Sequence, residues 1–317
     1  MRKLFITGIT GFVGNELTRR LCQEYQVYGL VRTSSNKSAL DPIKDILNKI
    51  EIKYGNLTDS AAIKRIIKEV APNYIIHLGG ATAVRHSFES PMEFQETNHL
   101  ATVNLVHAAL ELSEFKKFIF ASTMETYGDQ EQKIPFKEDL ILKPLSPYSV
   151  SKVASDYYIR MAGKALGLPY IISRACNTFG RKDNTGYVVE YLITQMLKNE
   201  EVYVGTPDAI RDLMYIDDHV NAYVTALKSN VINEVFNFSS GSEIMMKELA
   251  LKIKELIGYK KEINFSFPPD YPWRPIVDPY LSLDSTKAKK VLGWEAKVSL
   301  DEGLKNTIAY WRKKINA

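Results

Sequence analysis

The stretch Lys3–Gly14 reads KLFITGITGFVG, an apolar run followed by glycines spaced three residues apart. The apolar run predicts a short buried strand, and the segment Glu16–Glu24 predicts a helix after the turn. Glycine permits a tight bend at Gly8, lets the backbone approach a pyrophosphate at Gly11, and lets the helix pack closely at Gly14. The N–H groups and the dipole at the start of that helix would then face the phosphates. The stretch therefore predicts a strand–turn–helix unit that binds a dinucleotide.

Apolar strands alternate with helices through the first half of the chain. Further strands are predicted at Gln26–Val31, Glu51–Tyr54, Asn73–Leu78, Lys117–Ala121 and Pro169–Ser173, with helices at Ser60–Val70, Pro91–Leu112 and Pro147–Leu166. This order is typical of the α/β class with a Rossmann-type doubly wound parallel sheet, which binds ligands at the carboxyl ends of its strands.

The predicted elements become shorter beyond Arg174. They fall at Tyr187–Lys198, Val202–Val204, Leu213–Ile216, Asp217–Leu227, Glu234–Asn237 and Met246–Ile257, and a proline-rich stretch, Phe267–Pro279, precedes the final helices. We expect a smaller, mixed C-terminal substrate lobe. The predicted division is a dinucleotide-binding domain of residues 1–173 plus 211–241 and a substrate lobe of residues 174–210 plus 242–317.

Composition argues against several other classes of protein. The net charge of +4 is modest for 317 residues, and basic residues alternate with acids along the predicted helices, which indicates solvated faces rather than a nucleic-acid groove. The sequence has no run of about 20 apolar residues and no signal-peptide pattern. Cys22 and Cys176 are too few and too far apart for a disulfide framework or a cysteine zinc site, and the five histidines lack metal-ligand spacing. We expect a cytoplasmic protein that binds no metal, nucleic acid or membrane.

Tyr148 and Lys152 stand four residues apart, just after Ser146-Pro147. Serine followed by proline predicts the capped start of a helix. Residues four apart share one helix face, so the ammonium of Lys152 can lie near the phenol of Tyr148 and favour its phenolate. A phenol with a lowered pKa can serve as a general base. Together with the glycine turn, the pair points to a nicotinamide enzyme. His77, at the end of a predicted strand, is interpreted as a hydrogen-bonded core imidazole.

A series of short motifs follows in order along nearly the whole chain. They are TGITGFVG at 7–14, HLGGA at 77–81, TN at 97–98, ASTMETYG at 121–128, PYSVSK at 147–152, RD at 211–212 before YIDD at 215–218, and LGW at 292–294. The set resembles the extended short-chain dehydrogenase/reductase superfamily, in particular its nucleotide-sugar epimerase and dehydratase branch. The resemblance implies a tightly held nicotinamide cofactor and a nucleotide-diphosphate sugar as substrate.

The resemblance also implies catalytic roles. It places Tyr148 and Lys152 beside the nicotinamide and the Thr123 hydroxyl on the reacting sugar hydroxyl. The tyrosinate would take the proton of the sugar 4-hydroxyl while hydride passes to the cofactor, which gives a 4-keto sugar. Glu125 occupies the position where 4,6-dehydratases and UDP-glucuronate decarboxylases place a second base, although some epimerases and 4-ketoreductases keep glutamate there too.

One residue departs from the pattern of dTDP-glucose dehydratases. Those enzymes have an aspartate where this chain has Met124, whereas GDP-mannose 4,6-dehydratases manage with a non-acidic residue. A sugar-nucleotide 4,6-dehydratase is therefore the leading expectation. A nucleotide-sugar 4-epimerase, a 4-keto-6-deoxy-sugar reductase and, more distantly, a non-catalytic dinucleotide-sensing scaffold stay open.

Ligand contacts follow from the same resemblance. The expected cofactor contacts are Gly8, Thr10, Gly11, Phe12, Val13, Gly14, Arg32, Ser34, Asn56, Leu57, Leu78, Gly79, Gly80, Asn98, Tyr148 and Lys152, and the expected substrate contacts are Thr82, Ser87, Asn177, Arg211 and Arg274. No acid follows the second strand to accept a ribose 2′-hydroxyl, while Arg32 can pair with a 2′-phosphate to which Ser34 donates. This favours NADP as cofactor, with NAD as the alternative.

The long predicted helices Pro91–Leu112 and Pro147–Leu166 carry small and apolar residues on more than one side. One face can cover the sheet while another meets a partner helix. This pattern favours a homodimer through a four-helix bundle; the alternative is that both helices are buried within a monomer.

Overall fold

The computed structural model of the chain describes residues 1–35, 37–269 and 278–316. These residues form two compact units. The first comprises Met1–Gly128, Ile141–Arg174 and Val220–Phe236, and the second comprises Asp129–Leu140, Ala175–His219 and Asn237–Ala317. The predicted division assigns the dinucleotide to one part of the chain and the nucleotide sugar to the other, and this assignment of ligands stays a prediction.

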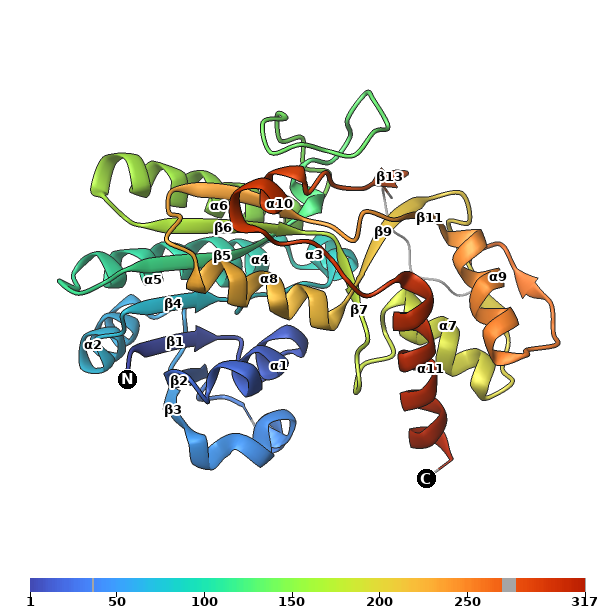
Figure 1. The fold of residues 1–317 in the computed structure, drawn as a ribbon, viewed down its shortest axis with the longest axis horizontal. Coiled ribbons are helices and arrows are strands. Elements are labelled where there is room, and N and C mark those ends of the chain that lie inside the picture. The colour runs from blue at the N-terminus through green and yellow to red at the C-terminus, as the bar shows by residue number, and fades with distance from the viewer. Residues whose placement is uncertain (36, 270–277, 317) are drawn as a thin grey trace. The chain divides into compact units, whose positions relative to one another are not determined.

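A seven-stranded sheet organises the first unit (Figure 1). Its strands are β1 (Lys3–Thr7), β2 (Gln26–Val31), β3 (Ile50–Tyr54), β4 (Tyr74–His77), β5 (Lys117–Thr123), β6 (Tyr170–Ala175) and β10 (Glu234–Phe238), in the order β10-β6-β5-β4-β1-β2-β3. β1 lies between β2 and β4 and pairs in parallel with both. The predicted α/β class with a Rossmann-type parallel sheet is confirmed.

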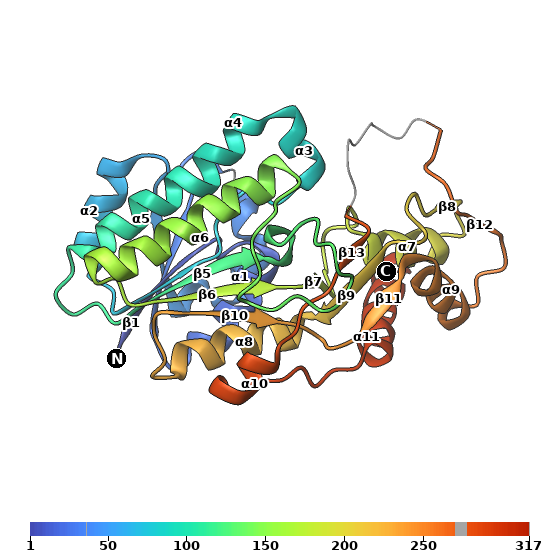
Figure 2. The same cartoon turned by 90° about the horizontal axis from the view of Figure 1, so that it is seen from above.

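Helices pack on both faces of this sheet. They are α1 (Phe12–Leu21), α2 (Ser60–Val70), α5 (Ala101–Leu110), α6 (Pro147–Leu166) and α8 (Ile216–Lys228). Figure 2 shows α5 and α6 over one face and α8 on the other. α2 illustrates why, because its Ile63, Ile66, Ile67 and Val70 recur with helical spacing and are all buried in the core that also takes in Leu105.

The predicted helix Pro91–Leu112 is one rod with an irregular centre. It runs as α4 (Pro91–Phe94), a π-helical stretch η2 (Gln95–Leu100) and then α5. Such π turns are rare and occur frequently at functional sites. Three further short helices were not anticipated: η1 (Lys37–Lys49), α3 (Val84–Glu89) and η3 (Met124–Thr126).

The second unit contains a four-stranded sheet, a two-stranded sheet and four helices in its described residues. The larger sheet has the order β11 (Glu243–Met245), β9 (Ile210–Tyr215), β13 (Tyr280–Leu281), with β7 (Asn177–Phe179) also paired to β9; the smaller joins β8 (Val202–Tyr203) to β12 (Ile263–Asn264). The helices are α7 (Val188–Leu197), α9 (Met246–Ile257), α10 (Thr286–Leu292) and α11 (Leu300–Ile315). α7, α9 and α11 share one apolar core that includes Leu192, Leu249 and Leu304.

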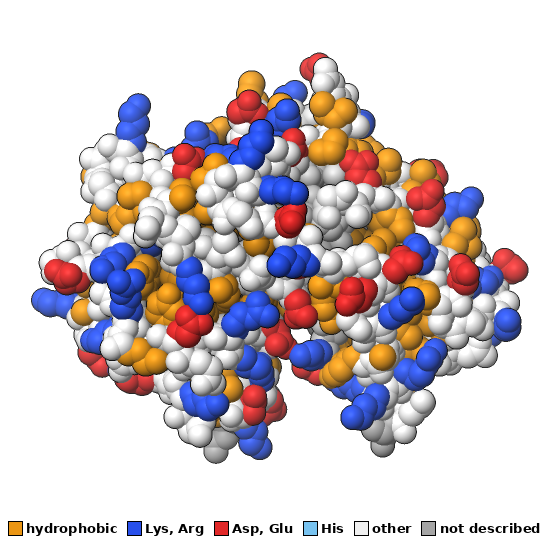
Figure 3. Space-filling view, in the orientation of Figure 1, with side chains coloured by type: hydrophobic (Ala, Val, Ile, Leu, Met, Phe, Trp, Pro, Cys, Tyr) orange, Lys and Arg blue, Asp and Glu red, His pale blue; other side chains and the backbone are white. Residues whose placement is uncertain are grey.

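Charges of both signs are interspersed on the face of the molecule drawn in Figure 3. Among the described residues, no helix is long and apolar enough to cross a membrane.

Candidate active site

The start of α6 fixes the position of Tyr148. Ser146 caps the helix in a reciprocal box, because its hydroxyl accepts from the Ser149 N–H at 3.1 Å and the Ser149 hydroxyl accepts from the Ser146 N–H at 3.0 Å. Pro147 occupies the first turn, as predicted. The Tyr148 ring is buried and meets the ring of Phe94 edge-on, with 6.2 Å between centroids. The cap fixes where the helix begins, and the ring contact packs the Tyr148 ring against Phe94.

Lys152 lies one turn further along and is also buried. Its ammonium donates to the Ala121 carbonyl of β5 at 2.8 Å and stands 4.8 Å from the centroid of the Phe120 ring. Burial lowers the pKa of Lys152 to about 8. A partly desolvated cation at this place would stabilise an anion nearby, which is what a tyrosinate base requires.

Asn98 in η2 ties α6 to the loop after β4. Its Oδ1 accepts from the Ala81 N–H at 2.8 Å, and its Nδ2 donates to the Ala81 carbonyl at 3.0 Å and to the Ser151 hydroxyl at 2.9 Å. Ser151 in turn donates to the Tyr148 carbonyl at 2.6 Å. The π turn therefore places the buried amide of Asn98 in contact with α6, the helix that carries Tyr148.

Ser151, inside the PYSVSK motif, and Ser155, beyond it, are site residues to which the sequence analysis gave no role. Ser155 donates to the Ser151 carbonyl at 2.9 Å and to the Asn98 carbonyl at 3.2 Å. The signal was available, since 148, 151, 152 and 155 fall at the three- and four-residue spacing of one helix face.

Thr123 and Glu125 share one turn at the carboxyl end of β5. The Thr123 hydroxyl accepts from the Glu125 N–H at 3.3 Å, and the Thr126 hydroxyl donates to the Thr123 carbonyl at 2.7 Å. Glu125 is partly buried in η3. A hydroxyl and a carboxylate are thus presented two residues apart, in the same unit as Tyr148 and Lys152.

The glycine turn fits a dinucleotide pyrophosphate. Gly8 has φ +72°, and its carbonyl accepts from the Gly11 N–H at 2.9 Å. A Cβ on Gly14 would lie 2.0 Å from the Gly8 carbonyl oxygen, so that only glycine lets α1 begin this close to the turn. Gly11 is the N-cap of α1 and makes no side-chain cap hydrogen bond, and the positive end of the helix dipole at this turn suits a phosphate. The expected contacts Thr10, Phe12 and Val13 belong to this turn and to the first residues of α1.

His77 is a core imidazole, as interpreted from the sequence. Its Nδ1 bonds to the Thr7 hydroxyl at 2.7 Å and its Nε2 to the Thr102 hydroxyl at 3.0 Å. The Thr102 hydroxyl donates its proton to a backbone carbonyl, so its oxygen accepts from the Nε2–H of His77. The Thr7 oxygen accepts from the Gly79 N–H at 3.0 Å, and its own proton goes to Nδ1. The ring is therefore neutral, donates through Nε2 and accepts at Nδ1. Burial first, and then the charge of Lys152, lowers the pKa of His77 to about 3.

The remaining expected cofactor residues lie after β2, β3 and β4. Arg32 and Ser34 are exposed after β2. Asn56 Oδ1 accepts from the Thr58 N–H at 3.2 Å, and the Leu57 carbonyl accepts from Asn104 at 2.9 Å. Leu78, Gly79 and Gly80 follow β4, where a Cβ on Gly80 would lie 2.6 Å from Asn98 Oδ1 and 3.8 Å from Lys152 Nζ.

The expected substrate residues are divided between the two units. In the first, Thr82 is exposed, whereas Ser87 is buried and donates to the Val84 carbonyl at 2.6 Å. In the second, Asn177 is exposed on β7, and Arg211 on β9 donates to the Ile210 and Asp278 carbonyls at 2.8 and 2.7 Å. Arg274 lies outside the described residues. The contacts of these residues with a nucleotide sugar stay predictions.

The fold and the glycine turn together define a protein of the short-chain dehydrogenase/reductase type, with a site for a nicotinamide dinucleotide. A family model described as GDP-mannose 4,6 dehydratase matches residues 5–307, and the chain belongs to this family of nucleotide-sugar dehydratases and epimerases. The predicted superfamily and branch are confirmed.

The relatives include both dehydratases and epimerases. A dTDP-D-glucose 4,6-dehydratase of Bos taurus is 29% identical over 99% of this chain and 90% of its own length. The crystal structure of a UDP-glucose 4-epimerase of Thermotoga maritima with UDP-glucose is 31% identical, covers 99% of both chains and has a TM-score of 0.89. A UDP-glucose 4-epimerase of Thermus thermophilus in complex with NAD is 25% identical over 98% of this chain and 99% of its own, with a TM-score of 0.85.

Proposed function

We propose that this protein is a nucleotide-diphosphate-sugar 4,6-dehydratase that works through a 4-keto intermediate. The observation that carries the proposal is the turn at the end of β5, where Glu125 donates its N–H to the hydroxyl of Thr123 at 3.3 Å. This bond ties the backbone of Glu125 to the hydroxyl that would orient the sugar, and we infer that the carboxylate of Glu125 reaches carbon 5, next to the oxidised carbon. An epimerase has no need of a second base there.

Each residue then has a chemical task. Lys152 favours the tyrosinate, Tyr148 takes the proton of the sugar 4-hydroxyl, and Thr123 holds that hydroxyl in place. A bound nicotinamide would supply the hydride chemistry, with carbon 4 of the sugar as the hydride donor and carbon 6 as the final hydride acceptor. Glu125 removes the proton from carbon 5, which the 4-keto group acidifies, and passes it to the leaving 6-hydroxyl, so that water departs and a 4-keto-5,6-ene is left. Once hydride has been added at carbon 6, a proton from solvent returns to carbon 5 and gives the 4-keto-6-deoxy sugar.

The second candidate is a 4-epimerase, favoured by the similarity to the Thermotoga enzyme. An epimerase would use the same Tyr148, Lys152 and Thr123 but would return hydride to carbon 4. The mass of the product separates the two reactions. GDP-mannose, dTDP-glucose and UDP-glucose are incubated with the protein; a product lighter by one water supports the dehydratase, and an isomer of unchanged mass supports the epimerase.

The role of Glu125 has a direct test. Glu125→Gln keeps the size of the side chain and the N–H bond to Thr123 but removes the base for carbon 5. Water loss and solvent-deuterium exchange at carbon 5 should fall together. Glu131→Gln, an exposed glutamate in the following loop, serves as the matched control. Release of the 4-keto-6-deoxy product at the wild-type rate from Glu125→Gln would show that another group carries out the elimination.

We further propose that the cofactor is NADP and that the protein is a homodimer. Arg32 stands exposed after β2 with no acid next to it in the sequence, which suits a 2′-phosphate, although the Thermus relative is in complex with NAD.

The proposed homodimer rests on α6, which exposes three apolar side chains along one stripe: Val150, Tyr157 and Met161. Such a stripe suits packing against a second copy of the chain. Sedimentation of Met161→Glu should give a monomer if this stripe forms the interface, and an unchanged dimer would move the interface elsewhere.

A further inference from the structure

Glu190 is a charged residue in an apolar position. It lies on α7 in the second unit, is fully buried, and has Val189, Ile193 and Met196 as buried neighbours on the same helix. Burying a carboxylate is costly unless hydrogen bonds compensate it. Replacing buried charges by well-packed apolar residues is often neutral or stabilising, so that stability alone does not account for a glutamate here.

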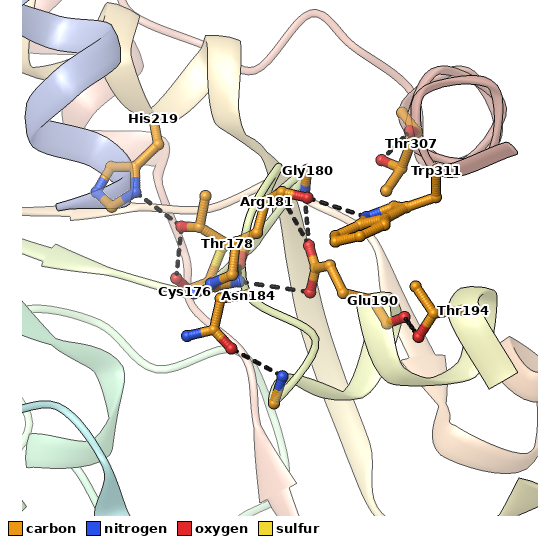
Figure 4. A network of polar contacts seen from close by, with 12 residues as sticks. Cys176, Thr178, Gly180, Arg181, Asn184, Glu190, Thr194, His219, Thr307 and Trp311 are labelled. Atoms are coloured by element: carbon orange, nitrogen blue, oxygen red, sulfur yellow. Dashed lines mark hydrogen bonds and ion pairs between the residues drawn. The ribbon is translucent and has the colours of Figure 1, made fainter. Parts of the chain in front are cut away.

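The carboxylate bonds to the backbone of a preceding turn (Figure 4). Oε1 accepts from the N–H groups of both Gly180 and Arg181, each at 2.8 Å, and Oε2 lies 3.7 Å from a guanidinium nitrogen of Arg181. A glutamate in the first turn of a helix usually bonds back to the cap of its own helix. Glu190 reaches instead to residues nine and ten positions earlier in the chain.

The turn that Glu190 holds follows β7 directly. Gly180 has φ +105°, and a Cβ there would lie 2.8 Å from the ring of Tyr215, so the chain bends sharply at a crowded point. Two other helices hold the same segment. The Thr178 hydroxyl bonds to His219 Nδ1 at 2.7 Å, and the indole N–H of Trp311 donates to the Arg181 carbonyl at 3.0 Å.

β7 therefore has little freedom, although it is only three residues long. Its first residue, Asn177, is exposed and pairs with Leu213 of β9, the strand that also carries Arg211. Both residues are expected contacts of the nucleotide sugar, Arg211 with its diphosphate and Asn177 with its diphosphate or its sugar. A short strand with an exposed binding residue at one end is restrained at the other end by buried groups from α7, α8 and α11.

We propose, resting on the function above, that Glu190 is a positioning residue for the nucleotide sugar: through the N–H groups of Gly180 and Arg181 it fixes β7 and so orients Asn177. Glu190 does not touch the substrate. Its loss leaves the turn without an acceptor and lets Asn177 sample several orientations, which weakens binding of the diphosphate without altering the acid–base residues of the first unit.

The test compares Glu190→Ala with two further variants. Glu190→Gln keeps one oxygen that can accept both N–H groups and should restore most of the function. Thr194→Val is the matched control, because Thr194 is buried one turn along α7 and its hydroxyl donates to the Glu190 and Tyr191 carbonyls of that helix rather than to the turn after β7. GDP-mannose, dTDP-glucose and UDP-glucose are titrated in turn, and backbone hydrogen exchange is followed for the peptide covering residues 176–187.

Loss of two charge-assisted hydrogen bonds should raise Kd and KM for the sugar nucleotide at least about tenfold in Glu190→Ala, with kcat within about threefold of wild type. Exchange in 176–187 should accelerate, and Thr194→Val should change neither quantity. Unchanged Kd and unchanged exchange in Glu190→Ala overturn the proposal. If Glu190→Ala does not fold, Trp311→Phe decides instead, since it removes the bond to the Arg181 carbonyl while keeping an aromatic ring in the core of the second unit, and it should act in the same direction.

The experiment distinguishes failure of the Glu190 proposal from failure of the proposed function. A wild-type protein that binds none of the three sugar nucleotides refutes the proposed function, and hydrogen exchange then decides by itself whether Glu190 fixes the segment. Accelerated exchange together with unchanged Kd would show that Glu190 holds the turn but does not orient a substrate residue, which also overturns the proposal.

Discussion

Replacing Asn98 by alanine tests the link between η2, the loop after β4 and α6. The side chain is buried and makes three hydrogen bonds, two with Ala81 and one with Ser151. A net hydrogen bond contributes about 1 kcal/mol, and a buried group left without its partner costs about 1–3 kcal/mol. Asn98→Ala should therefore lower the free energy of unfolding by about 3–5 kcal/mol.

The assay is urea denaturation, with Asn104→Ala as the control. Asn104 lies on the same rod, further along in α5, and makes one bond, to the Leu57 carbonyl at 2.9 Å. Its loss should cost about 1 kcal/mol. Catalytic turnover should fall more in Asn98→Ala as well, because Asn98 aligns the helix of Tyr148 and Lys152. Equal losses of stability in the two variants would refute the assignment of Asn98 as the buried link.

Three further outcomes are expected. Tyr148→Phe should keep the fold and cofactor binding but lower turnover at least about 10²-fold, and near-normal kcat would remove the phenol from the mechanism. Arg32→Asp should shift the preference from NADP towards NAD in a direct titration, since the carboxylate repels a 2′-phosphate; a wild-type protein that already prefers NAD contradicts the proposal. Burial lowers the pKa of both His77 and His219 to about 3, from 6.5, so the unfolded chain binds more protons between these values. The contribution of the two histidines to stability should be constant above about pH 6.5 and fall towards about pH 3 by up to about 1.4 kcal/mol per pH unit for each histidine, and urea midpoints at about pH 7 and about pH 5 that do not differ would contradict this.

The first unit was largely predictable because its signals are local. Apolar runs located the strands, and the Ser146-Pro147 pair located the start of α6 at Pro147. α1 begins at Phe12 rather than Glu16, since the helix is capped by Gly11 and no polar side chain announces it. The interruption at η2 escaped prediction because one wide turn hardly alters an apolar pattern with a period of about 3.6 residues.

The second unit was predicted less well because its strands are short and pair at long range. β8, β12 and β13 have two residues each, too few for any alternation to be read. The same limit applied to the site. Tyr148, Lys152 and Asn98 belong to recognisable motifs, whereas Glu190 reads as an ordinary surface glutamate until the fold buries it.

The turn after β5 separates two levels of control over the chemistry. In the proposed mechanism, oxidation of the sugar depends on α6, which supplies Tyr148 and Lys152, whereas the fate of the oxidised sugar depends on Glu125, two residues beyond Thr123 and on another element. That mechanism predicts that substitutions at residues 124 and 125 redirect the product while Tyr148, Lys152 and Thr123 stay intact. Residues 124 and 125 are therefore the first positions to vary in directed evolution of new sugar products.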